Sequence, residues 1–272
     1  MSKSKSFQEL NLVDGFLFGA STENPDDAEY IAKLISERAT GKEVSQITVT
    51  QEKPLLGMDV GYRGIRMDLY VTQKEQNRIA KVYDIEPNRY GLSELPWRSR
   101  FSQALTDAKL LKSGQNYSEM PEYFSIWILT GDPFGKNEML YCVKNCVEGY
   151  PDIVYNDGVT KLFLYVGGEL GNNGALRDLL RYFRQSDKKH VVDKDIEKLH
   201  TIVEKIRHNR KVGEQYMTFQ EMVEYEKAEA RQEAIIATIK VCKNLGASDE
   251  QIIVNLVKEF AISEEDAKSY LN

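Results

Sequence analysis

Cysteine is scarce in this chain of 272 residues, and none of its cysteines forms a C-x-x-C pair. The three present are Cys142, Cys146 and Cys242. Their odd number suits a reducing compartment, so we expect a cytoplasmic protein. Cys142 and Cys146 lie four residues apart in YCVKNC, but the further ligands that a two-cysteine metal site would need are not evident. The sequence therefore favours buried cysteines without a chemical role.

Long apolar runs are also missing. No segment approaches the roughly 18 consecutive apolar residues of a membrane-spanning helix, and the start, MSKSKSFQEL, contains no apolar signal-peptide core. We therefore expect neither membrane insertion nor export. Basic residues are not in excess, because 36 Lys and Arg against 42 Asp and Glu give a net charge of −6. That balance argues against a broad basic surface for nucleic acid, while a local basic groove stays compatible with it.

The composition that remains, 42% hydrophobic and 29% charged, is that of a folded globular protein. Periodicity predicts a helix over residues 24–41, with Asn24 as N-cap and Gly41 at its end, and a second helix over 95–112. The chain from residue 174 onward reads as helix almost throughout. Together these segments predict an α/β fold with a mixed central sheet flanked by helices and a helical C-terminal region. The predicted strands are 44–50, 65–71, 78–86, 123–130, 139–147 and 161–167.

The helix over 95–112 has an apolar stripe at helical spacing. Pro96 suits its first turn and Gly114 follows its end. We expect the stripe to be its buried face, as in most amphipathic helices. The residues of this stripe are Trp97, Phe101, Ala104, Leu105 and Ala108.

Three regions are expected along the chain: a domain over 1–185, a helical region over 186–245 and a small helical unit over 246–272. The small unit has capping-box patterns at Ser248 with Gln251 and at Ser263 with Asp266. Two short helices bury little by themselves. They are therefore expected to dock on the long helix, on the main domain or on another chain, which would make a homo-oligomer.

The hairpin over 66–89 carries acids inside its strands. Asp68 and Glu86 are an even number of residues apart, so a hairpin symmetric about Asn77 places them opposite one another on one face. Asp84 shares the face of Glu86 by alternation, although it could instead pair with a neighbouring base. Two bare carboxylates would repel, whereas a bound Mg²⁺ would reverse that repulsion. The alternative is a solvated face on which Arg66 and Lys81 neutralise the charges of the acids.

Several segments in this order resemble the PD-(D/E)XK nucleases, and within them the transposase-associated, recombination-promoting nucleases. The resemblance spans nearly the whole chain, and the acidic motif alone is weakly specific. The segments that carry it are DGFLFGASTENPDDAEYIAKLI, IRMDLYV, VYDIEPN, LPWRSRFSQALTDAKLLKSGQNYSEMPEYFSIWILTGDPFG and NLGASDEQIIVNLVKEFAISEEDAKSYL.

The resemblance implies a role for each matching residue. Asp68 and Glu86 would be ligands of Mg²⁺ or Mn²⁺, and the backbone carbonyl of Pro87 would be a third ligand. Asn88 stands where the family has Lys or Gln, the group that orients the attacking water. Asn is shorter than Gln and cannot carry the charge of Lys, so it would act through a water, or Arg89 would replace it, or the site would be inactive.

The helix that follows the motif offers further candidates for the substrate. Arg98 and Arg100 suit phosphate oxygens because a guanidinium presents a fork of donors. Gln103 lies on the same segment and could reach the site. For each of the three, a solvated helix face is the competing interpretation.

The sequence thus predicts a metal-dependent DNA endonuclease. One alternative is an inactive nuclease-fold protein that binds DNA or a protein partner. Another is a helix-mediated assembly protein in which the nuclease core is only a scaffold. The first predicts Mg²⁺-dependent nicking, the second salt-sensitive DNA binding without cleavage, and the third a stable oligomer.

Overall fold

The computed structural model describes residues 5–55, 65–88 and 92–271. The chain forms two units, Met1–Val212 and Gly213–Asn272, and each has its own internal packing. Within the described residues, no helix is both long and apolar enough to cross a membrane.

The first unit is built around a mixed six-stranded sheet in the order β1-β2-β3-β4-β8-β5. The pairs β1–β2, β2–β3 and β5–β8 are antiparallel, while β3–β4 and β4–β8 are parallel. The predicted α/β architecture with a mixed sheet is confirmed. The strands of this sheet are β1 (Ile47–Leu55), β2 (Ile65–Glu75), β3 (Arg78–Asn88), β4 (Glu122–Leu129), β5 (Leu140–Val143) and β8 (Val159–Tyr165).

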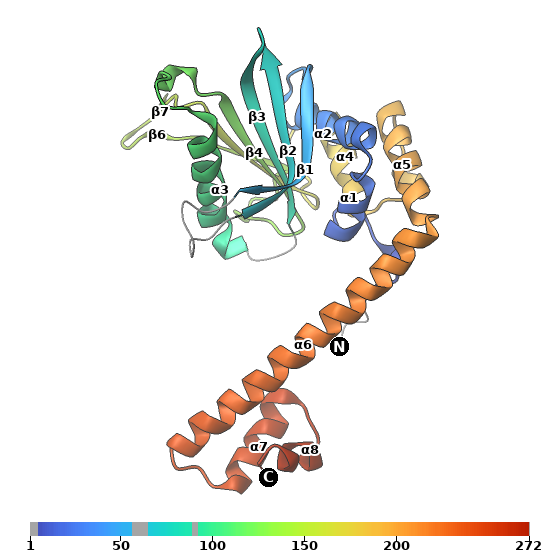
Figure 1. Ribbon diagram of the computed structural model, residues 1–272, viewed down its shortest axis with the longest axis vertical. Helices are drawn as coiled ribbons and strands as arrows, with labels where there is room; N and C mark the ends of the chain where they lie inside the picture. Colours follow the sequence, from blue (N-terminus) through green and yellow to red (C-terminus); the bar gives the residue numbers. More distant parts are fainter. Residues whose placement is uncertain (1–4, 56–64, 89–91, 272) are drawn as a thin grey trace. The chain divides into compact units, whose positions relative to one another are not determined.

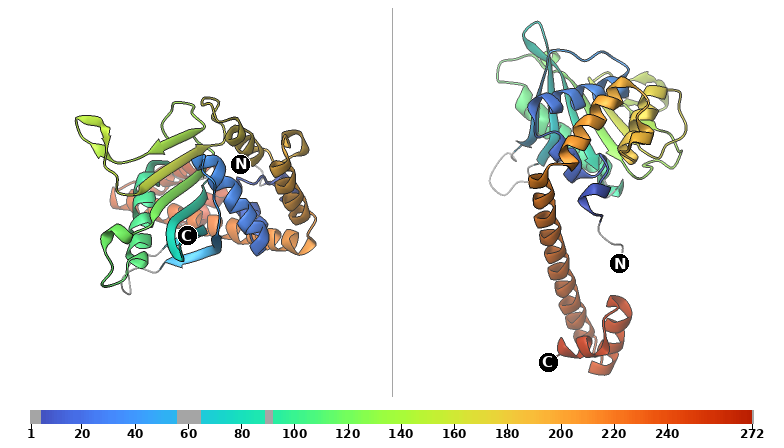
Figure 2. Two further views of the ribbon diagram at one scale, coloured as in Figure 1. Left: turned by 90° about the horizontal axis from the view of Figure 1, so that it is seen from above. Right: turned by 90° about the vertical axis from the view of Figure 1, so that its right-hand side faces the viewer.

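The single strand predicted over 139–147 is wrong in its second half. The structure has β5 there, and then β6 (Cys146–Val147), which pairs with β7 (Tyr150–Val154) in a separate two-stranded hairpin. Figure 2 shows this hairpin projecting from the edge of the main sheet. Cys142 and Cys146 are exposed in these short strands, and Cys242 is half-buried. The expectation of buried cysteines is therefore wrong for the first two, which lie in the short strands β5 and β6 with exposed side chains.

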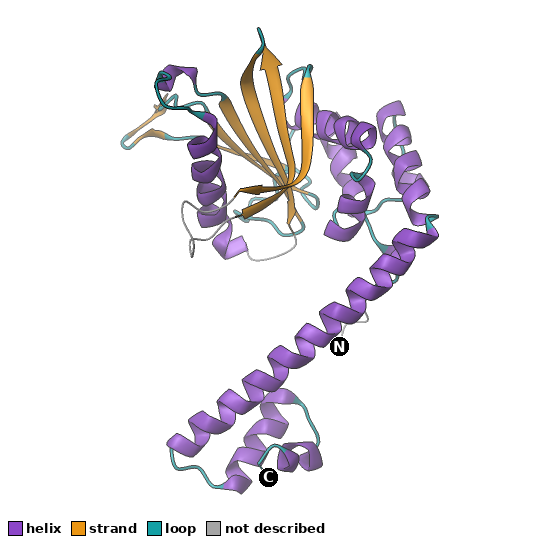
Figure 3. Ribbon diagram, viewed as in Figure 1, coloured by secondary structure: helices purple, strands orange, loops and turns teal. Residues whose placement is uncertain are grey.

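Helices lie on both faces of the sheet. Figure 1 shows α3 against one face and α1, α2 and α4 on the other side, and Figure 3 shows the same layers by type of structure. The helices of the first unit are α1 (Gly15–Ser21), α2 (Pro25–Thr40), α3 (Leu95–Leu110), α4 (Gly174–Arg184) and α5 (Lys194–Arg207). Short 3-10 turns occur at Phe7–Glu9, Leu92–Glu94, Tyr117–Glu119 and Lys188–His190.

The ends of α2 are those predicted. The Asn24 side chain accepts hydrogen bonds from the backbone N–H groups of Asp26 and Asp27, and Gly41 ends the helix at a φ of 66°. A left-handed residue at this position is easiest for glycine, which has no Cβ.

The β2–β3 hairpin has the predicted strand pairing because a β-bulge offsets the register that its turn would set. Its turn has two residues, Gln76 and Asn77, both with positive φ, as in a type I′ turn. A turn of this length would pair the strands symmetrically about the peptide between them. A β-bulge next to Gln73 then shifts the register by one residue, so that Tyr70 lies opposite Asp84. The pairing near the acids is consequently the one expected from symmetry about Asn77.

Helix α3 turns a different face to the sheet from the one predicted. Its side chains Trp97 and Phe101 are 63% and 37% exposed, and Ala104 and Ala108 are exposed as well. The prediction of a buried apolar stripe is therefore wrong for all of its residues except Leu105. The physical reason is the sheet face beneath, which carries carboxylates that need hydrogen-bond donors. The residues that α3 buries are Leu95, Ser99, Ser102, Leu105 and Thr106.

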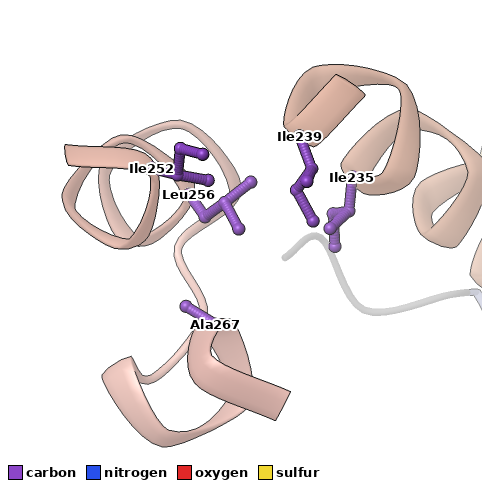
Figure 4. Packing of buried hydrophobic residues seen from close by; sticks show 5 residues of the cluster. All are labelled: Ile235, Ile239, Ile252, Leu256 and Ala267. Carbon is purple, nitrogen blue, oxygen red and sulfur yellow. The ribbon is translucent and has the colours of Figure 1, made fainter. Parts of the chain in front are cut away.

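The second unit contains α6 (Arg210–Asn244) from Gly213 onward, α7 (Asp249–Phe260) and α8 (Glu264–Ser269). The capping box of Ser248 and Gln251 is present, and Ser263 caps α8 by accepting from the Asp266 N–H. Figure 4 shows Ile235 and Ile239 of α6 facing side chains of the short helices. The expected docking on the long helix is confirmed, whereas the homo-oligomer stays a prediction. The buried cluster consists of Ile235, Ile239, Ile252, Leu256 and Ala267.

Candidate acid-lined site

Three carboxylates gather on the face of the sheet that α3 covers. Tyr70 lies opposite Asp84, and continuing the same register places Asp68 of β2 opposite Glu86 of β3. The Glu86 Oε1 atom accepts a hydrogen bond of 3.1 Å from the backbone N–H of Asp68. The structure thus brings together the two acids that the sequence singled out, on adjacent antiparallel strands and on one face.

Asp84 lies at the centre of this face and is fully buried. Its Oδ2 atom accepts hydrogen bonds from the Ser102 hydroxyl at 2.6 Å and from the Tyr123 hydroxyl at 2.8 Å. These two hydroxyl oxygens are 3.3 Å apart. The Oδ1 atom of Asp84 is buried and has no hydrogen-bond partner within the described part of the chain. A helix residue and a residue of a parallel strand therefore fix one oxygen of Asp84 and leave the other without a donor.

Sequence reasoning placed Asp84 beside Glu86 by alternation but gave it no role, and it missed Ser102 and Tyr123. A partial signal was available. Ser99, Ser102 and Thr106 recur at helical spacing on α3, and a row of hydroxyl residues on one helix side fits a polar partner surface. Tyr123 gave no comparable signal, since Tyr is common in the interior of strands.

Burial raises the pKa of all three carboxyl groups. Burial raises the pKa of Asp68 to about 6, and the negative charge of Asp84 adds to that increase. Burial also raises the pKa of Glu86 well above its usual value, with further contributions from Asp84 and then Asp68. The pKa of Asp84 is raised by the same cause, although its two hydroxyl donors oppose the increase. The arrangement is a set of like charges that repel one another in a poorly solvated place.

Among the described residues, Arg98 is the cation whose positive charge acts on all three acids. Its charge lowers the pKa of Asp68, Asp84 and Glu86 and so opposes the effect of burial. Its guanidinium lies 5.2 Å from the centre of the Trp127 ring. Trp127 follows Ser125 on β4, and the Glu86–Trp127 pair places it on the acid-bearing face. Arg98 therefore lies near the acids. A phosphate of a substrate bound at these acids would be near its guanidinium, as the predicted phosphate contact requires.

The other residues predicted to bind substrate lie farther along or around α3. The Arg100 guanidinium lies 5.0 Å from the centre of the Trp97 ring. Its charge contributes, after burial, to lowering the pKa of Lys161 on β8, so Arg100 and Lys161 are close. Gln103 donates to the Asp107 carboxylate at 3.3 Å, along its own helix. The structure therefore groups Arg98 with the acids and places Arg100 beside a second cation.

The end of β3 keeps its ladder with β4 through the motif. Pro87 pairs with Ile128 and Asn88 with Leu129, so the parallel register continues through Pro87 although proline has no backbone N–H to donate. The side chain of Asn88 and all of Arg89 lie outside the residues that the structure describes. Their predicted catalytic roles, and that of the Pro87 carbonyl, stay predictions.

The donor chemistry of this face suits a hard divalent cation. Its oxygens belong to carboxyl groups, which Mg²⁺ and Mn²⁺ prefer when ionised, and the buried Asp84 Oδ1 has no hydrogen-bond partner among the described residues. In the described residues, no group of three or more His, Cys, Asp or Glu side chains is arranged to hold a single metal ion. Asp68 and Glu86 are the two carboxylates of this face that were predicted as metal ligands, and the metal ion stays a prediction.

A cavity of about 410 Å³ opens on the opposite face of the sheet. Phe124, Leu140 and Leu162 contribute apolar lining, and Lys42, which also lies 5.8 Å from the centre of the Phe124 ring, contributes charge. None of the three clustered carboxylates lines this cavity. The acid cluster and the cavity are therefore separate features of the two faces.

Comparison of the chain with models of protein families, with curated proteins and with solved structures gives no match.

Proposed function

We propose that this protein is a metal-dependent nuclease that hydrolyses phosphodiester bonds in DNA, with the PD-(D/E)XK core that its sequence resembles. The observation that carries this proposal is the meeting of Asp68 and Glu86 on one buried face of the hairpin, joined by the 3.1 Å hydrogen bond from the Asp68 N–H. A carboxyl pair of which Glu86 is buried and Asp68 is half-buried is costly for the fold, and carboxyl groups with raised pKa values occur preferentially at functional sites.

The chain order around the pair supports the same proposal. Helix α2, the antiparallel strands β1, β2 and β3, helix α3 and the parallel strand β4 follow one another in sequence and lie next to each other in space. The first five of these elements follow the helix–strand–strand–strand–helix order of the PD-(D/E)XK core that the sequence resembles. The motif acids then fall on the second and third strands, as in that family.

The residues divide the chemistry between them. Asp68 and Glu86, with the backbone carbonyl of Pro87, would hold a Mg²⁺ or Mn²⁺ ion, whose chemistry when bound is to activate a water and neutralise phosphate charge. Arg98 binds a phosphate oxygen through its guanidinium and offsets the charge of the three acids. Asn88 orients the attacking water. Asp84, held by Ser102 and Tyr123, lies beside Glu86 and adds to the increase in the pKa of Glu86.

The alternative is a nuclease-fold protein that binds DNA without cutting it. The observation behind it is Asn88 at the position where the resemblance implies Lys or Gln. Loss of one positioned donor typically lowers the rate of a reaction by a factor of about 10²–10³. The alternative therefore predicts the same binding with cleavage at background level.

A plasmid-nicking experiment separates these functions. Supercoiled plasmid is incubated with the protein and Mg²⁺ or Mn²⁺, beside Glu86→Ala and an exposed control, Glu148→Ala, purified identically. We expect metal-dependent nicking by the wild type and by Glu148→Ala, and none by Glu86→Ala. Equal nicking by all three would trace the activity to a contaminant and overturn the proposal.

A further inference from the structure

An exposed aromatic and basic patch adjoins the acid cluster. It is formed by the outer side of the first turns of α3, with Trp97, Arg100 and Phe101, together with Lys161 of β8. Trp97 is 63% exposed, and the Arg100 guanidinium covers one side of its ring at 5.0 Å from the ring centre. Exposed tryptophan is unusual on a globular protein, because its large apolar surface is normally buried.

The patch lies close to the carboxylates in both sequence and sheet register. Trp97 directly precedes Arg98, whose charge acts on Asp68, Asp84 and Glu86. Across the sheet, Asp84 pairs with Ser125, and Ser125 pairs with Lys161. Two steps between neighbouring strands span roughly 10 Å. Lys161 thus lies on the acid-bearing face of the sheet, two strands from Asp84, and Arg100 lies close to Lys161.

The aromatic ring and the cations of the patch indicate which kind of ligand it would bind. Cations beside an acid cluster, in a protein of net charge −6, match a ligand that carries regularly spaced negative charge. An aromatic ring backed by a guanidinium matches a flat, unpaired base, since bases stack on aromatic side chains only when they are freed from their own duplex stack. A protein partner would match the apolar ring but not the Arg100 guanidinium that lies on the ring, nor Lys161 close to Arg100.

We propose that Trp97, backed by Arg100, is a stacking platform for an unpaired base, so that the substrate of this site is single-stranded DNA. The inference rests on the proposed nuclease function for its location. Arg98 and Lys161 bind the flanking phosphates, while the free side of the indole stacks on a base. Duplex DNA presents no free base face and gains only the phosphate contacts.

Tryptophan fluorescence tests the platform directly. The chain has two tryptophans, and the other, Trp127, is only 2% exposed. The full-length protein is titrated with a 12-nucleotide oligothymidylate, and with a duplex of equal length, in EDTA so that no cleavage occurs. We expect the single strand to quench Trp97 emission and to bind more tightly than the duplex at the same salt concentration.

Variants separate stacking from charge. Trp97→Ala is expected to weaken oligothymidylate binding by about ten- to a hundredfold, measured by anisotropy of a labelled strand, with little change for the duplex. Trp97→Phe is expected to retain most of the affinity and lose the quenching. Tyr117→Ala, which removes an aromatic side chain that is 84% exposed beyond the other end of α3, is the matched control and should bind like wild type. Circular dichroism and thermal melting verify that each variant is folded.

Three results would overturn the platform: no quenching by the single strand, an equal loss of single-strand and duplex binding in Trp97→Ala, or a wild-type dimer that Trp97→Ala dissociates while DNA binding is unchanged. The last result would make the patch a self-interface. Failure of the nuclease function is distinguishable, because it would leave the Trp97-dependent binding intact while the nicking assay stays negative.

Discussion

The two faces of the β2–β3 hairpin differ sharply although they alternate residue by residue. One face has Leu69, Val71 and Ile85 completely buried, and Tyr83 stacked on Phe124 with ring centres 5.0 Å apart. The other face places Asp68, Asp84 and Glu86 beneath α3, beside hydroxyl groups and one guanidinium. The same strands therefore supply both an apolar core and an acid cluster.

The difference shows which face stabilises the fold and which face is costly to it. Each fully buried aliphatic side chain contributes roughly 1.5–3 kcal/mol, and such residues line the first face. The second face buries like charges, which lowers stability unless a cation or a proton neutralises them. Clusters of titratable groups with raised pKa values occur preferentially at functional sites, and the second face of the hairpin carries such a cluster.

The largest expected effect is on activity, in Asp68→Ala. We expect this change to abolish metal-dependent nicking, because it removes one of two carboxylate ligands, while DNA binding in EDTA is unchanged. The metal-free variant should melt at the wild-type temperature or slightly above it, since one of several repelling acids is gone. Melting well below wild type would show that Asp68 stabilises the fold. It would contradict the view that only the apolar face of the hairpin does so.

Asn88→Lys tests whether Asn88 limits the proposed reaction at the acid-bearing face. Lys supplies the cation that the resemblance places there, so nicking should increase if Asn88 limits the reaction. A positioned donor at developing charge is worth a factor of about 10²–10³, and we expect a gain that is visible in the plasmid assay. A Lys variant less active than wild type would mean that Asn88 is already the adapted residue.

Leu69→Ala probes the apolar face one residue away from Asp68. Leu69 is completely buried, and truncating such a side chain typically costs about 2–5 kcal/mol of unfolding free energy. Urea denaturation of Leu69→Ala and Asp68→Ala side by side measures the comparison directly. Similar stabilities for the two variants would contradict the division of roles between the faces.

The smallest expected effect is a dependence of stability on pH in the absence of metal. The folded-state pKa of Asp68 is raised from 3.8 to about 6, so the folded protein holds this proton more readily than the unfolded chain. The resulting stability is present below about pH 4 and is lost as the pH rises through 6.

Asp68→Asn isolates this contribution. Its melting temperature in EDTA should fall less than that of wild type between pH 5 and pH 7. Mg²⁺ at pH 7 should then raise the melting temperature of wild type and leave that of Asp68→Asn nearly unchanged. Identical pH profiles for the two proteins would show that the Asp68 pKa is not raised.

Local patterns in the sequence determined much of the architecture. Alternation of Met67, Leu69 and Val71 with polar neighbours specified a half-buried strand, and the Asn24 cap and Gly41 specified the ends of α2, because these features act over only a few residues. The even separation of Asp68 and Glu86 also placed both on one face. The two-residue turn alone would shift the pairing by one residue, and the bulge next to Gln73 restores the register in which Asp68 lies opposite Glu86.

Tertiary structure alone decided which surface each helix buries and which polar groups meet. The stripe with Trp97 and Phe101 has sound helical periodicity, yet α3 buries Ser99, Ser102 and Thr106 instead. Periodicity defines the faces of a helix but not the chemistry of the layer that each face meets. The hydroxyls of Ser102 and Tyr123 converge on Asp84 from elements 18 and 39 residues away in the chain. Such a contact depends on the packing of three elements, and no short window of sequence contains it.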